Sequence, residues 1–325
     1  METKVKSVSE FIEAIQQKRP KDIEGEEPQA LWFRGEGSIN FKTPLVPCSY
    51  RTLAETFQGK IDDLFASKNI KQVENNIQAE FNRRAHRYIS TKNIENSQWN
   101  RYFLMQHYKI KTRLLDWTEN AVISLFFAIS DKTCTKEDSV VWILNPFKLN
   151  DITIREIINS DKSCMIIPPG VDSDGPHELI MEDGKIRISE LTRRYVQMDF
   201  QKGSKDNKII YYPLAVHPTY LDERMTSQKT CFTIFGNKIN GLISNQSSSD
   251  FLSSVIIEGG LTKTKILNEL RILGIDYESV FPDLDGIGLS INSLFEKNFY
   301  DNRESMIHML KSLHDKLKTD DNGKK

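Results

Sequence analysis

The chain has 325 residues, of which 38% are hydrophobic and 27% charged, a composition typical of a folded globular protein rather than a disordered one. Its 44 Lys and Arg residues nearly balance its 45 Asp and Glu residues, so the net charge does not indicate a polyanionic partner. The polar start argues against a secretory leader, and the lack of a long apolar run argues against a membrane span. The four cysteines are too widely spaced for a zinc site or a disulfide scaffold. These features favour the cytoplasm.

Hydrophobic periodicity predicts helices near both ends of the chain and strands in its middle. The first half of the chain predicts a helix over 7–18, a strand over 30–38, a constrained loop over 44–51, helical sequence over 53–88 and a buried helix that begins near residue 116. The middle predicts a strand over 139–144, an irregular stretch over 150–185, a charged surface insertion or hairpin over 181–208, a strand over 209–216, a segment over 224–235 that ends in a strand, and a strand over 254–258. The last part predicts a helix over 263–273, a loop over 279–286, and one or two helices over 292–318 that turn Ile307, Leu310, Leu313 and Leu317 inward.

The separation of early helices from later strands favours an α+β fold over a regular βαβ alternation. We expect a mixed or antiparallel sheet with a helical N-terminal portion and a C-terminal helical cap. The predicted organisation is one domain over residues 1–290, with a surface insertion at about 150–208, followed by a C-terminal helical extension over 291–325.

Arg34 stands at the end of the first predicted strand, between Phe33 and Gly35. Glycine allows the backbone to turn sharply or to approach a ligand closely, and a side chain at a strand end can point into a cleft. The coincidence of an arginine, a ring and glycines predicts a ligand site. The alternative is a structural arginine that caps sheet carbonyls or pairs with Glu36.

The richest stretch for function runs over residues 106–128. Asp116 and Thr118 are both good helix N-cap residues and Glu119 stands three residues after Asp116, which predicts the start of a buried helix. Such a start presents free backbone N–H groups and the positive end of the helix dipole, so polar side chains beside it would form an anion site. The alternative is that Arg113 and Asp116 simply pair with each other. The candidate side chains are Gln106, His107, Thr112, Arg113 and Asp116.

Basic side chains are concentrated between Glu80 and Arg113, where eight Lys or Arg residues accompany two acids and several rings. Basic residues mixed with rings suit a phosphate backbone and stacked bases, so Arg83, Arg84 and Arg87 are candidates for a nucleic-acid patch. A solvated helix face explains the same pattern without any ligand.

Four blocks of the chain resemble the FRG domain family over roughly residues 7–290. These blocks are Leu31-Trp-Phe-Arg-Gly-Glu36, Gln106-His-Tyr with Thr112-Arg-Leu-Leu-Asp-Trp-Thr118, Arg224 with Gln228 and Phe232, and Leu273-Gly-Ile with Phe281-Pro-Asp-Leu-Asp-Gly286. The family commonly has Gly-x-Pro before Thr-Arg-Leu-Leu-Asp, where this chain has Lys109-Ile-Lys111, so this loop is expected to be less rigid. The resemblance implies a shared cleft and a bacterial setting in phage defence or toxin systems, and leaves the chemistry to be argued from the residues.

One hypothesis is an enzyme that consumes NAD. The aromatic-Arg-Gly strand end resembles the opening motif of arginine-type ADP-ribosyltransferases, whose arginine holds the phosphates or ribose of NAD. Such chemistry needs an anion clamp, a ring to stack on nicotinamide and a carboxylate for the ribose hydroxyls. Arg34 and Arg113 are the candidates for the clamp, Tyr108 or Trp117 for the ring, and Glu258 at a strand end for the carboxylate. The alternative for Glu258 is an exposed structural residue at a strand end. The pair of acids two residues apart on a late strand, typical of those enzymes, is missing here.

Two alternatives remain open. The first is a non-catalytic module that binds a nucleotide or nucleic acid through the same cleft and the basic run over 83–113. The second is a metal-dependent phosphoesterase that uses Asp283 and Asp285, because Asp-Leu-Asp-Gly resembles the first motif of haloacid-dehalogenase enzymes. Those aspartates could instead cap the final helices or bind Arg34 or Arg113.

The predicted site therefore has three groups of residues and no metal, and NAD is its candidate substrate rather than a resident cofactor. The candidate catalytic residues are Arg34, His107, Arg113, Asp116 and Glu258; the candidate ligand-binding residues are Phe33, Gly35, Gln106, Tyr108, Trp117, Thr118 and Gln228; and the candidate nucleic-acid patch is Arg83, Arg84 and Arg87.

Overall fold

The computed structural model describes residues 4–19, 30–57, 63–91, 94–95, 97–158, 178–181, 184–197, 212–301, 307 and 310–312. The chain forms two compact units, Met1–Ile275 and Asp276–Lys325. Within the described residues, no helix is both long and apolar enough to cross a membrane.

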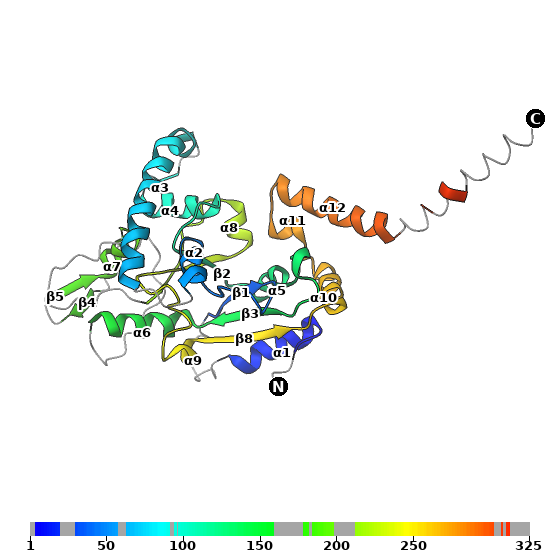
Figure 1. Ribbon diagram of the computed structural model, residues 1–325, viewed down its shortest axis with the longest axis horizontal. Helices are drawn as coiled ribbons and strands as arrows, with labels where there is room; N and C mark the ends of the chain where they lie inside the picture. The colour runs from blue at the N-terminus through cyan, green and yellow to red at the C-terminus, as the bar shows by residue number, and fades with distance from the viewer. Residues whose placement is uncertain are drawn as a thin grey trace, which may run out of the picture. The chain divides into compact units, whose positions relative to one another are not determined.

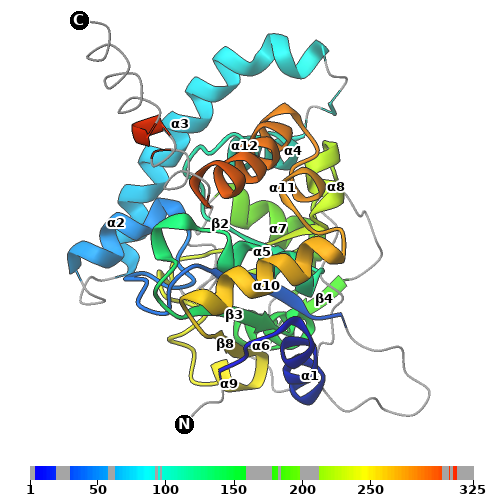
Figure 2. The ribbon, with the colours of Figure 1, turned by 90° about the vertical axis from the view of Figure 1, so that its right-hand side faces the viewer.

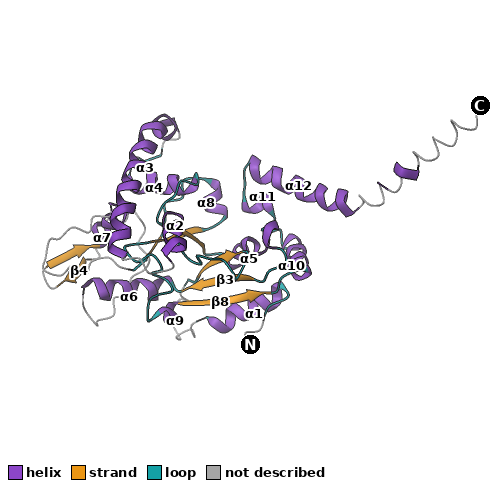
Figure 3. Ribbon diagram, viewed as in Figure 1, coloured by secondary structure: helices purple, strands orange, loops and turns teal. Residues whose placement is uncertain are grey.

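Six described strands of the first unit form one antiparallel sheet in the order β6-β7-β2-β1-β3-β8 (Figure 1). Figure 3 shows these strands in orange with helices, in purple, packed around them. This antiparallel sheet and its helices confirm the predicted α+β fold. The strands are β1 Trp32–Glu36, β2 Leu114–Thr118, β3 Ser139–Leu144, β6 Leu214–Val216, β7 Thr230–Ile234 and β8 Leu252–Ile257.

Strands β2 and β7 are buried on both faces of the sheet. Successive side chains of a strand point to opposite faces, so alternate residues enter two different hydrophobic cores. Leu114 and Phe232 belong to one core, whereas Leu115 and Cys231 belong to the other. Two-sided burial explains why both strands place apolar residues at neighbouring positions, and Asp116 is the one exposed residue of the two strands.

Helices cover the sheet and surround its ends. Helix α5 packs across β1, β2 and β3, and α10 packs on α5 (Figure 2). The described helices of the first unit are α1 Val8–Lys18, α2 Cys48–Phe57, α3 Asp63–Thr91, α4 Gln98–His107, α5 Ala121–Ile129, α6 Pro146–Ile158, α7 Ile188–Gln197, α8 Glu223–Ser227, α9 Ser248–Phe251 and α10 Leu261–Ile272, with a short 3₁₀ turn, η1, at Lys132–Cys134.

Gly35 lies where α5 packs tightly against β1. A Cβ atom at this position would lie 2.1 Å from the backbone oxygen of Ser124 and 2.6 Å from the backbone nitrogen of Ala128. The glycine therefore allows a helix, rather than a ligand, to approach β1 on that side.

The predicted helix start near Asp116 is wrong. Asp116 and Thr118 belong to β2, and α5 begins at Ala121 after Asn120, whose side chain accepts from the backbone N–H groups of Val122 and Ile123. The spacing of Asp116 and Glu119 fits a capping box, but pairing of β2 with β7 keeps Asp116 extended.

The predictions for the middle of the chain are partly wrong. Residues 146–158, expected to be irregular from residue 150 onward, form α6. A hairpin, β4 Glu178–Met181 with β5 Gly184–Arg187, begins within the stretch expected to be irregular, and only its second strand lies inside the segment over 181–208 for which a hairpin was one alternative. That segment also contains α7, which buries Leu191 and Tyr195 in a hydrophobic core and so is not merely a surface element. Residues 159–177 and 198–211 lie outside the described part of the chain.

The second unit contains α11 Tyr277–Val280 and α12 Leu284–Asp301 where a loop was expected over 279–286. The backbone N–H of Gly286 donates to Asp283 Oδ1 at 2.8 Å, so Asp283 caps the start of α12 as the structural alternative predicted. Ile307 and Leu310, expected to point inward, are exposed. Leu313 and Leu317 lie outside the described residues.

Candidate functional site

A cleft of about 660 Å³ lies in the first unit where β1 and β2 meet the end of α4, helix α8 and the η1 turn. Its volume is within the range of small-molecule sites. Nine of the predicted site residues line this cleft, although they come from segments far apart in sequence. They are Phe33, Arg34, Gly35, Gln106, His107, Asp116, Trp117, Thr118 and Gln228.

Arg34 joins two strands at the edge of the cleft. Its Nη1 donates to the backbone oxygen of Asp116 at 2.8 Å, and its Nε donates to Glu36 Oε1 at 3.2 Å. Glu36 is only 7% exposed and also accepts from the indole of Trp142 at 2.9 Å. Arg34 therefore pairs with Glu36, as the structural alternative predicted, and also lines the cleft.

Asp116 presents a carboxylate whose orientation is set by its neighbours. The Nε2 of Gln106 donates to both oxygens of Asp116, at 3.0 and 2.9 Å, and the hydroxyl of Thr112 donates to Oε1 of Gln106 at 2.5 Å. The side chain of Asp116 nevertheless remains 57% exposed at the cleft. Gln106 therefore positions Asp116, and Asp116 is the group left to contact a ligand.

His107 links two walls of the cleft. Its Nε2 lies 3.1 Å from Oδ2 of Asp222, which also caps α8 by accepting from the backbone N–H of Met225. Helix α8 carries Arg224 and ends beside Gln228, both of which line the cleft. Asp222 was not predicted to be a site residue. Its place before a short helix indicates only a helix N-cap.

Two further cleft residues escaped the sequence analysis. The guanidinium of Arg51 lies 5.4 Å from the ring centroid of Phe41, a cation–π arrangement at the cleft wall. Arg51 is also anchored by donating from Nε to the backbone oxygen of Val46 at 3.0 Å. Arg51 belongs to the segment over 44–51 that was expected to be a constrained loop, although it lies on α2, and Phe41 precedes that segment, so no pattern pointed to either residue.

Trp117 and Thr118 line the cleft with groups already engaged in the fold. The indole N–H of Trp117 donates to the hydroxyl of Thr233 at 3.1 Å, and the ring is buried. The hydroxyl of Thr118 donates to the backbone oxygen of Gln228 at 2.6 Å. These two residues shape the cleft, and their polar atoms tie β2 to neighbouring segments.

Arg113 lies outside the cleft. Its side chain is 0% exposed, and its Nε donates to Glu74 Oε2 at 2.8 Å while an Nη2 donates to the backbone oxygen of Tyr195 at 2.6 Å. Burial alone would lower the pKa of Arg113, but Glu74, Tyr102 and Tyr50 together outweigh burial and raise that pKa above its usual value. Arg113 joins α3, α7 and the sheet, and it does not pair with Asp116.

Glu258 also lies apart from the cleft-lining residues. Its carboxylate accepts from the hydroxyl of Thr262 at 2.8 Å and lies 3.4 Å from Nζ of Lys6. The hydroxyl of Thr262 and the charge of Lys6 lower its pKa, so the carboxylate is a stabilised anion at the surface. The arrangement matches the alternative of a structural residue at a strand end.

Tyr108 and the three arginines of the predicted nucleic-acid patch lie along a different surface, on α3 and at the end of α4. Tyr108 and Arg84 line an apolar groove that is described below. Arg83 and Arg84 both bind the carboxylate of Glu80, and these contacts lower the pKa of Glu80 to about 2. Arg87 is exposed. Part of the positive charge of the patch is thus neutralised locally.

Among the described residues, no cluster of histidine, cysteine and carboxylate side chains could hold a metal ion. This concerns only the residues whose placement is given above. The three cysteines described, Cys48, Cys134 and Cys231, are free thiols.

Comparisons with known proteins identify the segment that carries most of these residues. Residues 29–137 match the family model of the FRG domain, a span that includes β1, α4, β2 and α5. Comparison with curated proteins and with solved structures found no match. The family match covers Arg34, Gln106, His107 and Asp116, while α8 and β7, which complete the cleft, lie beyond it. The chain thus contains an FRG domain at residues 29–137; this supports the family that the sequence blocks predicted, over a shorter span than the roughly 7–290 of that resemblance.

Proposed function

We propose that the cleft binds a nucleotide and that the protein is an NAD-consuming enzyme of the ADP-ribosyltransferase-like kind. The observation that carries this proposal is the pair formed by Arg34 and Asp116. An anchored guanidinium and an oriented, exposed carboxylate lie at the same edge of one cleft. A phosphate–ribose ligand needs both kinds of group.

The chemistry assigns a role to each. When the bond between C1′ of the ribose and the nicotinamide nitrogen breaks, nicotinamide leaves with the electron pair and positive charge develops on the ribose. The carboxylate of Asp116 would stabilise that charge or accept hydrogen bonds from the ribose hydroxyls. Water or an acceptor nucleophile then attacks C1′ and loses a proton. Asp116 takes the part first expected of Glu258, because Glu258 does not line the cleft.

The remaining charges of the cleft suit the phosphates. Arg51, Lys109 and Arg224 line it together with Arg34, so several cations can contact a pyrophosphate. The ring of Phe41 beside Arg51 offers an exposed surface on which a base or nicotinamide could stack. A cleft of about 660 Å³ is large enough for a dinucleotide.

The non-catalytic alternative differs in what it requires of Asp116. A binding module needs Arg34 for affinity but has no need of an oriented carboxylate, which repels phosphates. The hydrogen bonds from Gln106 that fix Asp116 favour the catalytic proposal. For nucleic acid, the engagement of Arg83 and Arg84 by Glu80 makes the patch on α3 a weaker candidate.

The test is nicotinamide release from NAD by the purified full chain, with and without cell lysate as a source of acceptors. We expect release by the wild type, a loss of at least about 100-fold in Asp116→Asn and in Arg34→Ala, and full activity in Glu258→Gln. Calorimetric titration of NAD into Asp116→Asn should still show binding. If neither condition gives release, and binding of NAD depends on Arg34 alone, the protein is a binding module.

A cellular test addresses the proposed role as an effector in phage defence or toxin systems. Expression of the wild type should lower cellular NAD, whereas equal amounts of Asp116→Asn should leave it unchanged. Unchanged NAD with the wild type during phage infection would contradict that role.

A further inference from the structure

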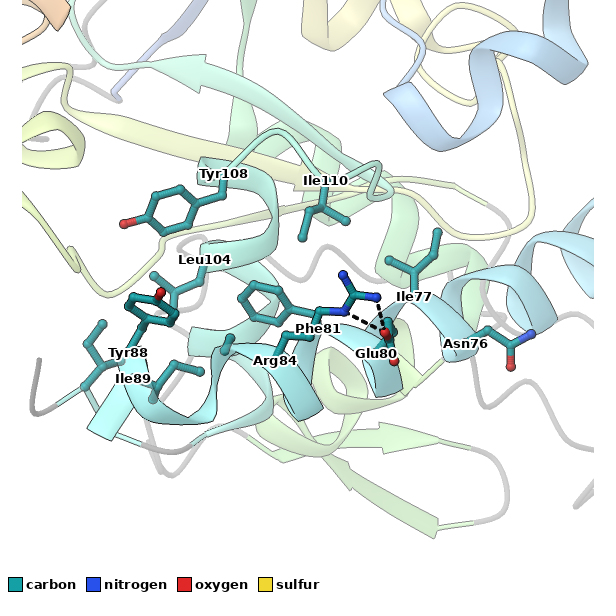
Figure 4. A pocket seen from close by; sticks show the side chains of 12 residues that line it. Asn76, Ile77, Glu80, Phe81, Arg84, Tyr88, Ile89, Leu104, Tyr108 and Ile110 are labelled. Atoms are coloured by element: carbon teal, nitrogen blue, oxygen red, sulfur yellow. Dashed lines mark hydrogen bonds and ion pairs between the residues drawn. The ribbon is translucent and has the colours of Figure 1, made fainter. Parts of the chain in front are cut away.

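A second concave surface lies between α3 and the end of α4, and its walls are mostly apolar. We call it the α3–α4 groove; it has a volume of about 880 Å³. Figure 4 shows Ile77, Phe81 and Ile89 on α3 facing Leu104, Tyr108 and Ile110 across it. The remaining lining residues are Asn76, Glu80, Arg84, Ala85, Tyr88 and Ile94.

The groove has the length of a helical segment. Its α3 wall runs from Asn76 to Ile89, which corresponds to about 20 Å at 1.5 Å per residue. Ile77, Phe81 and Tyr88 follow one another at about one and two helical turns, so they lie on one face of α3. Surfaces of this kind accept the apolar face of an amphipathic helix.

Tyr88 shows that the described residues of the first unit do not cover this apolar face. Its side chain is 73% exposed although it lines the groove. Tyr108 on the opposite wall is exposed as well. Two exposed tyrosines at the edge of an apolar groove resemble the anchors that are enriched in protein interfaces.

The charges at the groove edge indicate the charge expected of the partner. Arg84 and Glu80 line the groove, and Arg83 binds the same carboxylate of Glu80, so two guanidinium groups accompany one carboxylate there. Glu80 is held by both Arg83 and Arg84, so the groove edge keeps an excess of positive charge. A partner with acidic side chains next to its apolar residues would complement that charge.

We propose that the α3–α4 groove is a docking site for an amphipathic helix of another protein, whose apolar stripe is flanked by acidic residues. Its apolar side chains enter between Phe81, Ile89 and Leu104, and its carboxylates face Arg84. This inference is independent of the proposed NAD chemistry.

The probe is a fluorescently labelled synthetic helix of about 18 residues with leucines at i, i+4, i+7 and i+11 and glutamates beside them, titrated with the full chain and followed by fluorescence anisotropy. The matched peptide has lysine in place of each glutamate. We expect micromolar binding of the acidic peptide, at least 10-fold weaker binding of the basic one, and a loss of at least 10-fold in Tyr88→Asp and in Arg84→Glu. Because both side chains are largely exposed, these variants should fold like the wild type.

Arg87→Glu is the matched control, because it makes the same charge change on α3 at a residue that does not line the groove. We expect a smaller effect from it than from Arg84→Glu. Equal losses in the two variants, or binding that Tyr88→Asp leaves unchanged, would overturn the proposal. Light scattering that shows a dimer of the chain, dissociated by Tyr88→Asp, would make a second copy the occupant and would also overturn it.

Discussion

Arg34 holds Asp116 through the main chain: Nη1 of Arg34 lies 2.8 Å from the backbone oxygen of Asp116. This bond forms beside the register pair Phe33–Thr118 that joins β1 to β2. The residue that lines the cleft thus also fixes the backbone from which the carboxylate of Asp116 projects. A substitution at Arg34 therefore changes both the ligand contact and the position of its neighbour.

Arg34→Lys should separate charge from geometry. Lysine keeps the positive charge, but a compact ammonium cannot contact Glu36 and the oxygen of Asp116 in the way the guanidinium does. We expect nicotinamide release to fall at least about 10-fold and the free energy of unfolding to fall by about 1–2 kcal/mol, as for the loss of one hydrogen bond to a charged group. Nicotinamide release and urea unfolding measure the two effects. Wild-type release by this variant would mean that charge alone suffices.

Gln106→Glu should displace the carboxylate of Asp116. The variant replaces the N–H donors that hold Asp116 with a second negative charge, and the two carboxylates repel each other at neutral pH. We expect nicotinamide release to fall about 10- to 100-fold, a cost of about 1.4–2.7 kcal/mol in the activation barrier. Gln106→Met removes the donors without adding charge and should lose less. Equal losses in the two variants would indicate that the amide contacts the ligand directly.

Gly35→Ala should destabilise the fold by forcing α5 away from β1. The added methyl group would overlap the backbone of Ser124 and Ala128, which cannot move without displacing the helix. Overpacking of this kind costs about 3 kcal/mol in the free energy of unfolding. Gly37→Ala is the control, because its nearest neighbour would be the side chain of Asp131 at 3.2 Å. Similar unfolding midpoints for the two variants in urea would contradict this reading of Gly35.

Glu74→Gln should leave the charge of Arg113 buried without its partner. Both side chains are buried, and breaking such a pair typically costs about 3–5 kcal/mol in the free energy of unfolding. The double variant Glu74→Gln with Arg113→Met removes the buried charge as well, and we expect it to be less destabilised than the sum of the single variants. Additive losses in chemical denaturation would show that the two residues are not coupled.

His217 should make the protein less stable in mild acid. Burial lowers the pKa of His217 below its ordinary value of 6.5, although Glu119, 4.0 Å away, opposes this. The unfolded chain then binds a proton more readily than the folded one, so stability is full above about pH 6.5 and falls as the pH drops toward the lowered pKa. Urea unfolding between pH 5 and 8 should show this slope, and His217→Gln should reduce it. An unchanged slope in His217→Gln would assign the effect to other groups.

Local sequence patterns predicted elements whose residues interact mainly with near neighbours or with one face of the sheet. The strand over 139–144 and the helix over 7–18 were found within a residue of the predicted ends. The capping pattern at Asp116 failed because β2 pairs with β7, more than 100 residues later, and no local rule contains that information.

The candidate site shows the same limit. The ring, arginine and polar residues of the FRG segment were recognisable from their motifs, and the fold brings them together. Arg113 was assigned to the cleft because it lies near Asp116 in sequence, whereas its partner Glu74 lies 39 residues earlier on α3. Arg51 lies on α2 and Asp222 precedes the short helix α8, and neither segment has a sequence pattern that indicates a ligand site.

The end of α4 forms a partition between the two concave surfaces. Leu104 and Tyr108 line the α3–α4 groove, Gln106 and His107 line the cleft, and Ile110 lines both. A genetic screen that recovers inactive variants in this segment could therefore not tell a lost partner from a lost substrate. Dissecting the two surfaces requires substitutions outside this partition, on α3 for the groove and on β1 or α8 for the cleft.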